Sequence, residues 1–209
     1  PIKIKSSKLS GSKIEIDGGV SSQYISALML VAPYLIGGLD IRLKNEVVSR
    51  PYIEMTKNIM QYFGADVQFV DDIISVSNKK YEPKTFYVEG DWSGASYWCS
   101  ITALSDKANV KVNSLRLKSE QGDAVVAEIY SQLGVKTIYL ENSVVLQKVK
   151  KIQELKEFKY DFSNCPDLAQ TVVVTCLGLK LPCFFTGLKT LKIKETDRLL
   201  ALKTECEKL

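Results

Sequence analysis

The stretch KIEIDGGVSSQYISALMLVAPYL, residues 13–35, contains two hydrophobic patterns in direct succession. Residues 13–17 alternate between charged and apolar side chains, which is the period of a β-strand with one buried face. Residues 24–35 are almost wholly apolar, and a helix that is apolar on all sides belongs in the interior of a domain. Gly18-Gly19 and the polar run Ser21-Ser22-Gln23 separate the two patterns. The stretch therefore predicts a strand that leads through a polar turn into a buried helix.

The residues that follow complete a β-α-β-α-β-β unit. We expect a strand over 39–43, an amphipathic helix over 52–63, Gly64, and two short strands near 66–69 and 73–77. The glycine after the second helix suits a left-handed helix cap, because glycine adopts positive φ without a steric penalty.

This unit recurs twice more along the chain, as in repeat architectures. The second copy ends its outer helix at Gly134, 70 residues after Gly64, and similar residues flank both glycines. We expect its strands over residues 85–88, 110–112, 136–139 and 143–147. We expect a first helix that opens within residues 90–96 and runs to about residue 104, and a second helix over residues 123–133. We expect the elements of the third copy over residues 159–162, 168–179, 183–186 and 195–209. A third capping glycine and its strand pair do not follow, so the pattern predicts an interrupted repeat and an internal fragment.

The repeated unit places the chain in the α/β (α+β) class. The first helix of each copy is nearly all apolar, whereas the second is amphipathic. We therefore expect buried inner helices beneath outer helices and sheets.

The composition is that of an ordinary globular protein, with 45% hydrophobic and 25% charged residues. The net charge of +4 reflects lysines spread along the chain, and the one dense lysine run, residues 148–159, alternates with glutamates. No RNA-binding or helix-turn-helix signature accompanies it, so we expect no nucleic-acid partner. A modest basic excess also suits a site for small anions. No segment has the length and apolarity of a membrane span or a signal peptide, and we expect no membrane partner.

Cysteine and histidine usage narrows the possible chemistry. The five cysteines are odd in number and form no CxxC pair, which indicates reduced thiols in a cytoplasmic protein rather than a zinc site or a disulfide framework. The chain has no histidine. This excludes a Ser-His-Asp triad and a His-ligated metal within these residues, and we expect no metal site. Any proton transfer here must use Asp, Glu, Lys, Tyr or Cys.

Each apolar helix starts at a polar turn marked by glycine or proline. The three turns are Ser21-Ser22-Gln23, Asp91-Trp92-Ser93 and Pro166-Asp167. Free amides and the positive end of the helix dipole make such points natural anion sites, and the alternative is plain N-capping by Ser or Asp. For Asp91 both interpretations stay open. The paired hydroxyls of Ser21 and Ser22, with the amide of Gln23, favour a ligand.

A second set of polar loops precedes the outer helices. These loops are Ser49-Arg50-Pro51-Tyr52, Gln121-Gly122-Asp123 and Lys194-Glu195-Thr196-Asp197-Arg198. In the last loop, Thr196 and Asp197 suit the helix dipole, but Lys194 and Arg198 gain nothing from it. Two cations beside two carboxylates suit an anionic substrate, and Arg198 offers a bidentate fork to carboxylate or phosphate. The alternative is a surface cluster of salt bridges, which contributes little free energy.

Six motifs resemble those of the EPSP synthase (3-phosphoshikimate 1-carboxyvinyltransferase) family in order and spacing. They are Gly18-Gly19-Val20-Ser21-Ser22-Gln23 with Ser26-Ala27-Leu28, Ser49 to Thr56, Gly90-Asp91 with Ala95-Ser96-Tyr97, Gln121-Gly122-Asp123, Pro166-Asp167, and Lys194 to Arg198. Each motif alone is weak, but six in register across essentially the whole chain make the resemblance specific. The resemblance implies the family's inside-out α/β barrel of repeated β-α-β-α-β-β units, here truncated.

The resemblance also implies a transferase of the shikimate pathway, which serves chorismate and aromatic amino acid biosynthesis. Such an enzyme transfers the carboxyvinyl group of phosphoenolpyruvate to the 5-hydroxyl of shikimate 3-phosphate and releases phosphate. It uses no metal or organic cofactor. We therefore expect small-molecule substrates, no cofactor, a cytoplasmic location and a monomer for the full-length protein.

Carried over by position, the resemblance assigns a role to each candidate site residue. Contacts to shikimate 3-phosphate fall to Ser21, Ser22, Gln23, Ser49, Tyr52, Asp167 and Lys194. The three serines would hold its phosphate, while Gln23 and Arg198 would contact phosphoenolpyruvate. Asp167 would take the proton of the substrate hydroxyl. Lys194 and Glu195 would assist proton transfer at the vinyl carbon and the leaving oxygen.

Some parts of the family pattern have no counterpart in this chain. The family's N-terminal lysine, its glycine-rich phosphoenolpyruvate loop with the arginine that follows it, and its C-terminal His-Arg and Lys motifs would lie outside both ends. The two family domains would meet near Glu89-Gly90. Residues 1–89 would then belong to the second, central domain, and residues 90–209 to the first, terminal domain, incomplete at its C-terminus. The resemblance thus implies part of an active site, and we expect little or no activity from the chain alone.

Two other hypotheses stay open. UDP-N-acetylglucosamine 1-carboxyvinyltransferases share the fold and phosphoenolpyruvate, although the Lys194–Arg198 run and the Ser21-Ser22-Gln23 segment argue against them. A non-catalytic repeat module would keep the fold for binding or assembly. Against a decayed site stands the joint presence of four residues, Asp167, Lys194, Glu195 and Arg198.

Overall fold

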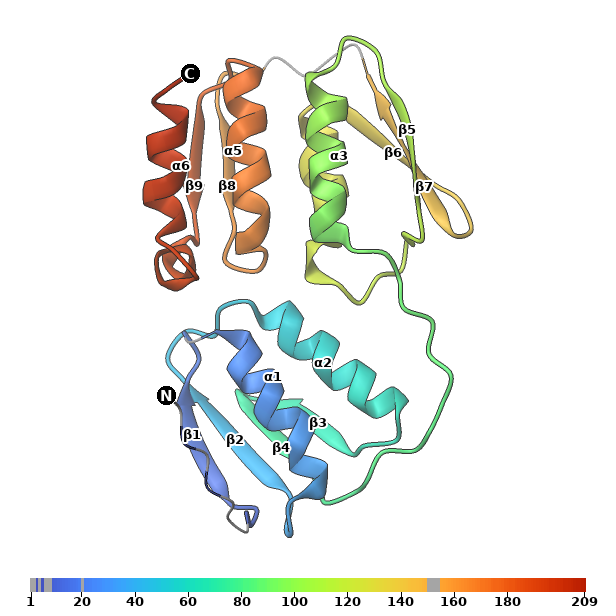
Figure 1. Ribbon diagram of the computed structural model, residues 1–209, viewed down its shortest axis with the longest axis vertical. Coiled ribbons are helices and arrows are strands. Elements are labelled where there is room, and N and C mark those ends of the chain that lie inside the picture. Colours follow the sequence, from blue (N-terminus) through green and yellow to red (C-terminus); the bar gives the residue numbers. More distant parts are fainter. Residues whose placement is uncertain (1–2, 4, 6–8, 20, 150–154) are drawn as a thin grey trace. The chain divides into compact units, whose positions relative to one another are not determined.

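Two compact units make up the protein in the computed structural model, which describes residues 3, 5, 9–19, 21–149 and 155–209. The chain divides between Phe86 and Tyr87 (Figure 1). This point is close to residue 89, where the family resemblance places a domain boundary; which family domain each unit corresponds to stays a prediction. Val20 of the first motif and residues 150–154 of the lysine-rich run lie outside the described residues.

The first unit is a four-stranded sheet with two helices against one face (Figure 1). Its elements are β1 (Lys13–Asp17), α1 (Ser22–Val31), η1 (Ala32–Tyr34), β2 (Leu39–Lys44), α2 (Arg50–Tyr62), β3 (Val67–Val70) and β4 (Ile73–Val76). The strand order is β1-β2-β4-β3, with β1 parallel to β2 and the other neighbours antiparallel. Ile25 and Ile53 from the helices and Ile41 and Ile74 from the sheet are fully buried between the two layers. The predicted β-α-β-α-β-β order is confirmed for this copy.

The second unit contains a three-stranded sheet and a two-stranded sheet, with α3 and α5 in front of the strands in Figure 1. Its elements are α3 (Trp92–Leu104), β5 (Asn109–Asn113), η2 (Gly122–Val125), α4 (Val126–Gln132), β6 (Val135–Tyr139), β7 (Ser143–Lys148), β8 (Phe158–Asp161), η3 (Pro166–Leu168), α5 (Ala169–Gly178), β9 (Cys183–Thr186), η4 (Lys189–Ile193) and α6 (Arg198–Cys206). The order β5-β7-β6 is antiparallel, whereas β8 and β9 are parallel. The largest buried side chains of its core are Trp92, Tyr130, Phe158 and Phe162.

The described residues form a mixed α/β structure in which no sheet closes into a barrel. No helix in the described part of the chain combines the length and apolarity needed to cross a membrane.

Residues 85–88 form no strand, so the strand predicted to begin the second copy is wrong. A strand requires a neighbour that satisfies its backbone N–H and C=O groups. In the first copy, the Gly18 N–H donates to the Lys44 carbonyl at 2.7 Å, directly after the paired strands β1 and β2. The second copy has the matching bond, in which the Gly90 N–H donates to the Ser114 carbonyl at 2.7 Å. The residues before Gly90, however, belong to the segment that joins the two units, and Tyr87 in this segment is exposed. They form no strand pair like that of β1 and β2.

Gly64 and Gly134 mark equivalent positions of the repeat, and Gly187 marks a close approach of two strand ends in the third copy. Gly64 and Gly134 each follow an outer helix with φ of +86°, which confirms the predicted left-handed caps. Gly187 follows β9 with φ of +74°, and a Cβ there would lie 2.2 Å from the Ser163 nitrogen. Glycine adopts this positive φ without a steric penalty, and the close approach of the two strand ends leaves no room for a Cβ at position 187.

The inner helices α1, α3 and α5 bury one face each. In α3, Ala95, Cys99 and Ala103 are buried, whereas Tyr97 and Ile101 are exposed. The expectation that these apolar helices lie in the interior is confirmed for the side chains that face the strands, which are buried. The described residues leave the opposite face open.

Candidate functional site

Two loops of the third copy meet at one edge of the β8–β9 pair. The strands are parallel and pair from Phe158 with Cys183 to Asp161 with Thr186, so their carboxyl ends lie together. Ligands of open α/β sheets bind outside the carboxyl ends of parallel strands, where such loops converge. The segment after β8 carries Asp167, and the segment after β9 leads to the Lys194–Arg198 run. The fold therefore brings the two predicted motifs of this copy together.

Four of the predicted residues form one ion-pair cluster. Arg198 Nη1 donates to Asp167 Oδ1 at 2.9 Å, and Arg198 Nη2 donates to Glu195 Oε2 at 2.6 Å. Lys194 Nζ lies 3.5 Å from the same Asp167 Oδ1. The Arg198 and Lys194 side chains retain 21% and 24% of their accessible surface, whereas Glu195 retains 78%. Two cations thus face a half-buried carboxylate, and a second carboxylate holds the arginine from the solvent side.

The pKa values of two groups in the cluster reflect these contacts. The hydrogen bond from Arg198 lowers the pKa of the Glu195 carboxyl, and the charge of Lys194 adds a smaller effect in the same direction. The hydrogen bond to Glu195 raises the pKa of Arg198, and the charge of Asp167 adds to this shift. Glu195 is therefore an anion and Arg198 a cation at neutral pH.

A helix cap places Arg198 in the cluster. The Asp197 carboxylate accepts hydrogen bonds from the backbone N–H groups of Leu199 at 3.1 Å and Leu200 at 3.0 Å. The helix consequently begins at Arg198 rather than near Glu195 as predicted, and it ends at Cys206. Glu195 stays in the loop ahead of the helix, where its carboxylate meets the Arg198 side chain.

The first unit has the same arrangement of loops at the carboxyl ends of β1 and β2. These strands are parallel, and α1 follows β1 just as α2 follows β2, so the two helix N-termini lie at one edge. The Val48 N–H donates to the Gly18 carbonyl at 3.2 Å, which ties the two loops together. Within the helices, the Ser26 and Thr56 hydroxyls lie 2.7 Å apart. Two positive helix ends that share one edge suit an anionic group.

The other five predicted residues lie at these two N-termini. Ser21 caps α1 and accepts a long hydrogen bond from the Gln23 N–H at 3.4 Å, and Ser22 is the first helical residue. Ser49 precedes α2, is buried, and has φ of +56°, a left-handed conformation that is uncommon for serine. Tyr52 lies in the first turn of α2, where its N–H donates to the Ser49 carbonyl at 3.1 Å.

In the middle copy, the polar side chains of the matching loops form hydrogen bonds within the protein. Asp91 caps α3 by accepting from the Ser93 N–H at 2.9 Å, which supports capping for this residue. Gln121 Nε2 donates to the Gly90 carbonyl at 2.8 Å and so connects the two loops. Asp123 is buried and accepts a hydrogen bond from the Ser93 hydroxyl. The sequence analysis assigned no role to Asp123. The pattern that could have indicated one is the polar loop that recurs before each outer helix.

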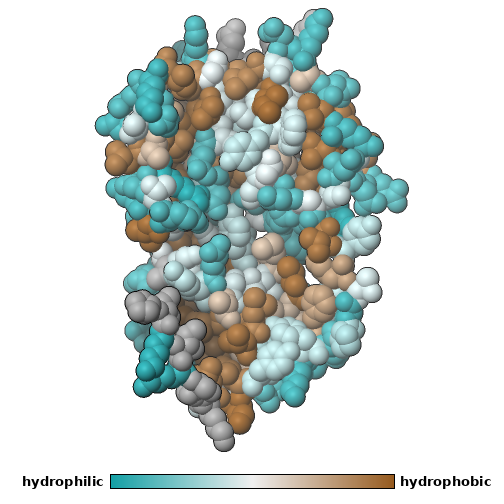
Figure 2. Space-filling model, viewed as in Figure 1, coloured by the Kyte–Doolittle hydropathy of each residue, from teal (hydrophilic) through white to brown (hydrophobic). Residues whose placement is uncertain are grey.

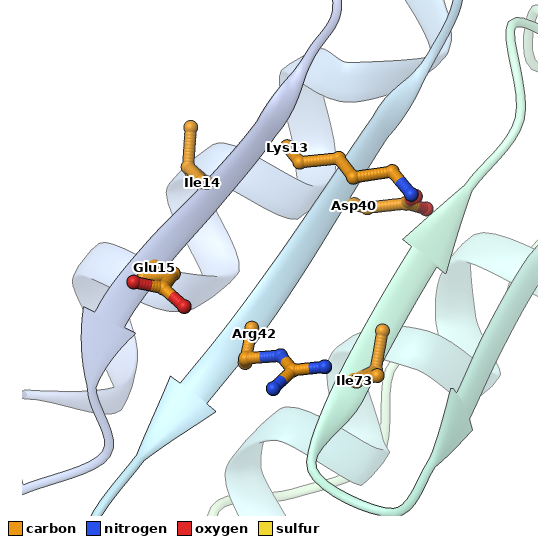
Figure 3. A pocket seen from close by; sticks show the side chains of 6 residues that line it. All are labelled: Lys13, Ile14, Glu15, Asp40, Arg42 and Ile73. Carbon is orange, nitrogen blue, oxygen red and sulfur yellow. The ribbon is translucent and has the colours of Figure 1, made fainter.

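A groove of about 470 Å³ lies on the sheet face of the first unit (Figure 3). Its lining side chains are Lys13, Ile14, Glu15, Asp40, Arg42 and Ile73, and none of the predicted site residues is among them. Figure 3 shows Lys13 reaching over β2 to Asp40, with 3.9 Å between Nζ and Oδ2. Exposed pairs of this kind are ordinary surface salt bridges. We therefore assign the candidate site to the loops. Among the described residues no group of three or more cysteines, aspartates and glutamates could hold a metal ion.

Comparison with known proteins agrees with the motifs. The profile of the family described as EPSP synthase (3-phosphoshikimate 1-carboxyvinyltransferase) matches residues 1–209. The chain is 49% identical over 214 residues to the 3-phosphoshikimate 1-carboxyvinyltransferase of Bacteroides fragilis strain YCH46, and 35% identical over 212 residues to that of Histophilus somni strain 2336. Both matches cover 100% of this chain but 51% and 48% of the relatives. The chain thus spans about half the length of the curated relatives it matches.

A solved structure shares the fold. The EPSP synthase from Acinetobacter baumannii, determined at 2.37 Å, superposes with a TM-score of 0.68 over 94% of this chain and 45% of that chain. The two sequences are 19% identical in this comparison, so the likeness concerns the fold alone.

Proposed function

The chain belongs to the EPSP synthase family, and from this membership we propose that it is part of an enzyme that joins phosphoenolpyruvate to shikimate 3-phosphate. The enzyme transfers the carboxyvinyl group to the 5-hydroxyl of shikimate 3-phosphate. The products are 5-enolpyruvylshikimate 3-phosphate and phosphate, in the pathway to chorismate and the aromatic amino acids.

The convergence of Asp167, Lys194 and Arg198 at the β8–β9 edge is the observation that carries this proposal. In the reaction one C–O bond forms to the enol carbon and the C–O bond to phosphate breaks, while the substrate hydroxyl loses its proton. A carboxylate that accepts this proton and cations that stabilise the negative oxygens are the groups that such a transfer requires. The chain has no histidine that could serve instead.

We assign proton transfer to the carboxylates and the lysine of the cluster. Asp167 takes the proton of the 5-hydroxyl, and its contacts with Lys194 and Arg198 fix the orientation of the carboxylate. Lys194 carries ammonium protons that can be donated to the leaving phosphate oxygen. Glu195, whose lowered pKa keeps it anionic, assists proton transfer at the vinyl carbon.

Arg198 and Gln23 are assigned to phosphoenolpyruvate. The Arg198 guanidinium has five donors in a planar fork and holds Glu195 through Nη2. Because Glu195 is the more exposed of its two carboxylate partners, a substrate carboxylate or phosphate can replace it at little cost in buried charge.

The phosphate of shikimate 3-phosphate is assigned to Ser21, Ser22 and Ser49. Their hydroxyls lie at the N-termini of α1 and α2, where free amides and the helix dipoles favour an anion. Gln23 and Tyr52 from the same helix turns, with Asp167 and Lys194, supply the other assigned contacts.

The domain assignment follows the same family membership. We propose that residues 1–89 are part of the central domain and residues 90–209 part of the terminal domain. We also propose a cytoplasmic, monomeric full-length enzyme that needs no cofactor.

Phosphate release from phosphoenolpyruvate tests the function directly. The full-length protein that contains this chain should release phosphate only when shikimate 3-phosphate is present, and residues 1–209 alone should show little or none. Release with UDP-N-acetylglucosamine in place of shikimate 3-phosphate would establish the related carboxyvinyltransferase activity instead. No release with either acceptor would favour a non-catalytic repeat module, and full turnover by residues 1–209 would contradict a partial active site.

Calorimetric titration tests the assigned contacts. Shikimate 3-phosphate should give heat with the parent chain, and Gln23→Ala and Lys194→Ala should weaken its binding about tenfold or more. The matched controls Gln68→Ala and Lys136→Ala change exposed residues on strands and should bind as the parent does. Equal binding by all four variants would remove these two contacts from the site.

A further inference from the structure

The outer face of the sheet in the first unit carries charged side chains in a regular alternation. Successive strand residues point to opposite faces, so every second residue of β1 and β2 projects away from the helices. These residues are Lys13, Glu15, Asp17, Asp40, Arg42 and Lys44. The strand register places each of them opposite a residue of the other charge. The helix side differs, since Leu30 and Val31 of α1 are exposed and hydrophobic patches are visible in the view of Figure 2.

The contacts on this face leave the Arg42 guanidinium without an ion-pair partner. Its neighbour across the strands, Glu15, pairs with Lys44 instead, at 2.5 Å between Oε2 and Nζ. The pKa of Glu15 reflects this pairing, because the hydrogen bond and the charge of Lys44 lower it most and the charge of Arg42 lowers it least. In the described part of the chain no hydrogen bond or ion pair engages the Arg42 side chain. A cation with free donors therefore lies on the sheet face.

Arg42 lines the groove of about 470 Å³ on this face, which has the size of a site for a small organic molecule. Figure 3 shows the Arg42 side chain reaching from β2 toward Ile73 of β4, while Lys13 reaches over β2 to Asp40. Asp40 and Arg42 lie two residues apart on one strand, so their side chains start about 7 Å apart on the same face. A carboxylate and a free guanidinium thus border the same groove.

Apolar side chains lie beside Arg42. Ile73 of β4 lines the groove, and Val70 of the edge strand β3 is the register partner of Ile73. Residues opposite each other in paired strands point to the same face, so Val70 extends the apolar surface beyond Ile73. Val70 is 60% exposed, whereas Ile74 is fully buried on the other face of the sheet. The groove therefore combines one apolar side with charges of both signs.

The charges select the chemical class of the ligand. A simple anion at Arg42 would meet the carboxylate of Asp40, and a simple cation at Asp40 would meet the guanidinium. A free α-amino acid carries one charge of each sign and avoids both repulsions. Its carboxylate can accept hydrogen bonds from the Arg42 fork, and its ammonium can donate to Asp40, whose contact with Lys13 is long at 3.9 Å. A large apolar side chain on the amino acid can cover Ile73 and Val70.

We propose that this groove binds a free α-amino acid with a large apolar side chain, held by Arg42 through its carboxylate and by Asp40 through its ammonium. Because the charged groups are open to water, the binding is weak, with a dissociation constant of about 1 mM. No residue assigned to the transferase reaction lines the groove. The site is therefore separate from the proposed active site and does not depend on the proposed activity.

Titration of L-phenylalanine into the full-length protein tests the proposal. With labelled isoleucine methyl groups, the NMR signal of Ile73 should shift until the site is saturated, and Ile73→Val identifies this signal. Ile74, which is fully buried, is the internal control and should not shift. Glycine, phenylpropionate and phenylethylamine lack the side chain, the ammonium and the carboxylate respectively, and each should bind at least about tenfold more weakly. A shift that rises without saturation, or equal binding of phenylpropionate, would overturn the proposal.

Two variants of the groove test the assigned contacts. Arg42→Gln and Asp40→Asn should each weaken L-phenylalanine binding about tenfold or more, since each removes a charge-assisted hydrogen bond. Lys136→Gln removes an exposed cation from β6 of the second unit and should bind as the parent does. The urea midpoints of all three variants should stay close to that of the parent, because the changed side chains are at least partly exposed. Binding by Arg42→Gln with the affinity of the parent would overturn the proposal.

Discussion

Arg198 Nη1 donates a hydrogen bond to Asp167 Oδ1 over 2.9 Å and so joins the first residue of α6 to η3, the short helix that follows β8. The two residues are 31 positions apart in the sequence and meet because β8 and β9 are parallel, with their following loops at one edge. A purely local salt-bridge cluster would contain only the Arg198–Glu195 pair. The contacts of Asp167 with both Lys194 and Arg198 connect two separate motifs and favour the functional hypothesis for the Lys194–Arg198 run.

Replacement of Asp167 by asparagine should lower the transferase activity of the full-length protein about 10²- to 10⁴-fold, because an amide cannot accept the hydroxyl proton. Phosphate release at saturating substrates measures this effect. The urea midpoint should change little, since the ion pairs of Asp167 are partly exposed. Asp106→Asn, at an exposed aspartate after α3, is the matched control and should retain full activity. A loss smaller than tenfold in Asp167→Asn would remove Asp167 as the general base.

The pKa of Glu195 should rise toward the ordinary glutamate value in the Arg198→Ala variant, because the hydrogen bond from Arg198 is the largest cause of its lowered pKa. Because the pKa of Glu195 is lower in the folded chain than in the unfolded chain, the ionised carboxylate stabilises the fold at pH values above the unfolded pKa. This contribution to the free energy of unfolding is lost as the pH falls through the lowered, folded-state pKa. NMR titration of the side-chain carboxyl carbons measures the shift. Glu15, whose pKa is lowered by Lys44, is the internal control and should titrate as in the parent.

Asp197→Ala should destabilise α6 by about 1 kcal/mol, because two backbone N–H groups of the first turn lose their acceptor. Hydrogen exchange of the Leu199 and Leu200 amides should become faster, while exchange in β5 and β7 should not change. Asp197→Asn keeps a capping oxygen and should behave nearly as the parent does. Equal exchange in the alanine and asparagine variants would show that the cap does not hold this turn.

Gly187→Ala should destabilise the chain more than Gly37→Ala. Both glycines have positive φ, of +74° and +89°, so an alanine at either position carries the strain of a left-handed conformation, about 1–2 kcal/mol. At position 187 the added Cβ would also lie 2.2 Å from the Ser163 nitrogen, whereas at position 37 no described atom outside the adjoining residues lies within 4 Å. Urea unfolding of the two variants measures the difference. Equal midpoints would mean that the β8–β9 edge relaxes freely around the added methyl group.

Local periodicity was sufficient for most of the elements. The strands Lys13–Asp17 and Cys183–Thr186 lie where the sequence patterns predicted them, and the helix Trp92–Leu104 ends at the predicted residue. Alternation of charged and apolar residues and long apolar runs are set by near neighbours in the chain, so they are readable without knowledge of the fold. The caps at Gly64 and Gly134 were predictable for the same reason, since a helix end and the conformational freedom of glycine are local properties. The motif residues of the candidate site were likewise recognisable in sequence.

The remaining features depend on which segments the fold places side by side. Residues 85–88 have a strand-like sequence but form no strand, because the described structure gives them no paired neighbour. The exposed outer face of α3 was not predictable from a helix that is apolar all round, since burial depends on what packs against each side. Nothing in the sequence showed that Arg198 binds both Glu195 and Asp167. Ion-pair partners are chosen by distance in space, and the parallel pairing of β8 with β9 sets that distance here.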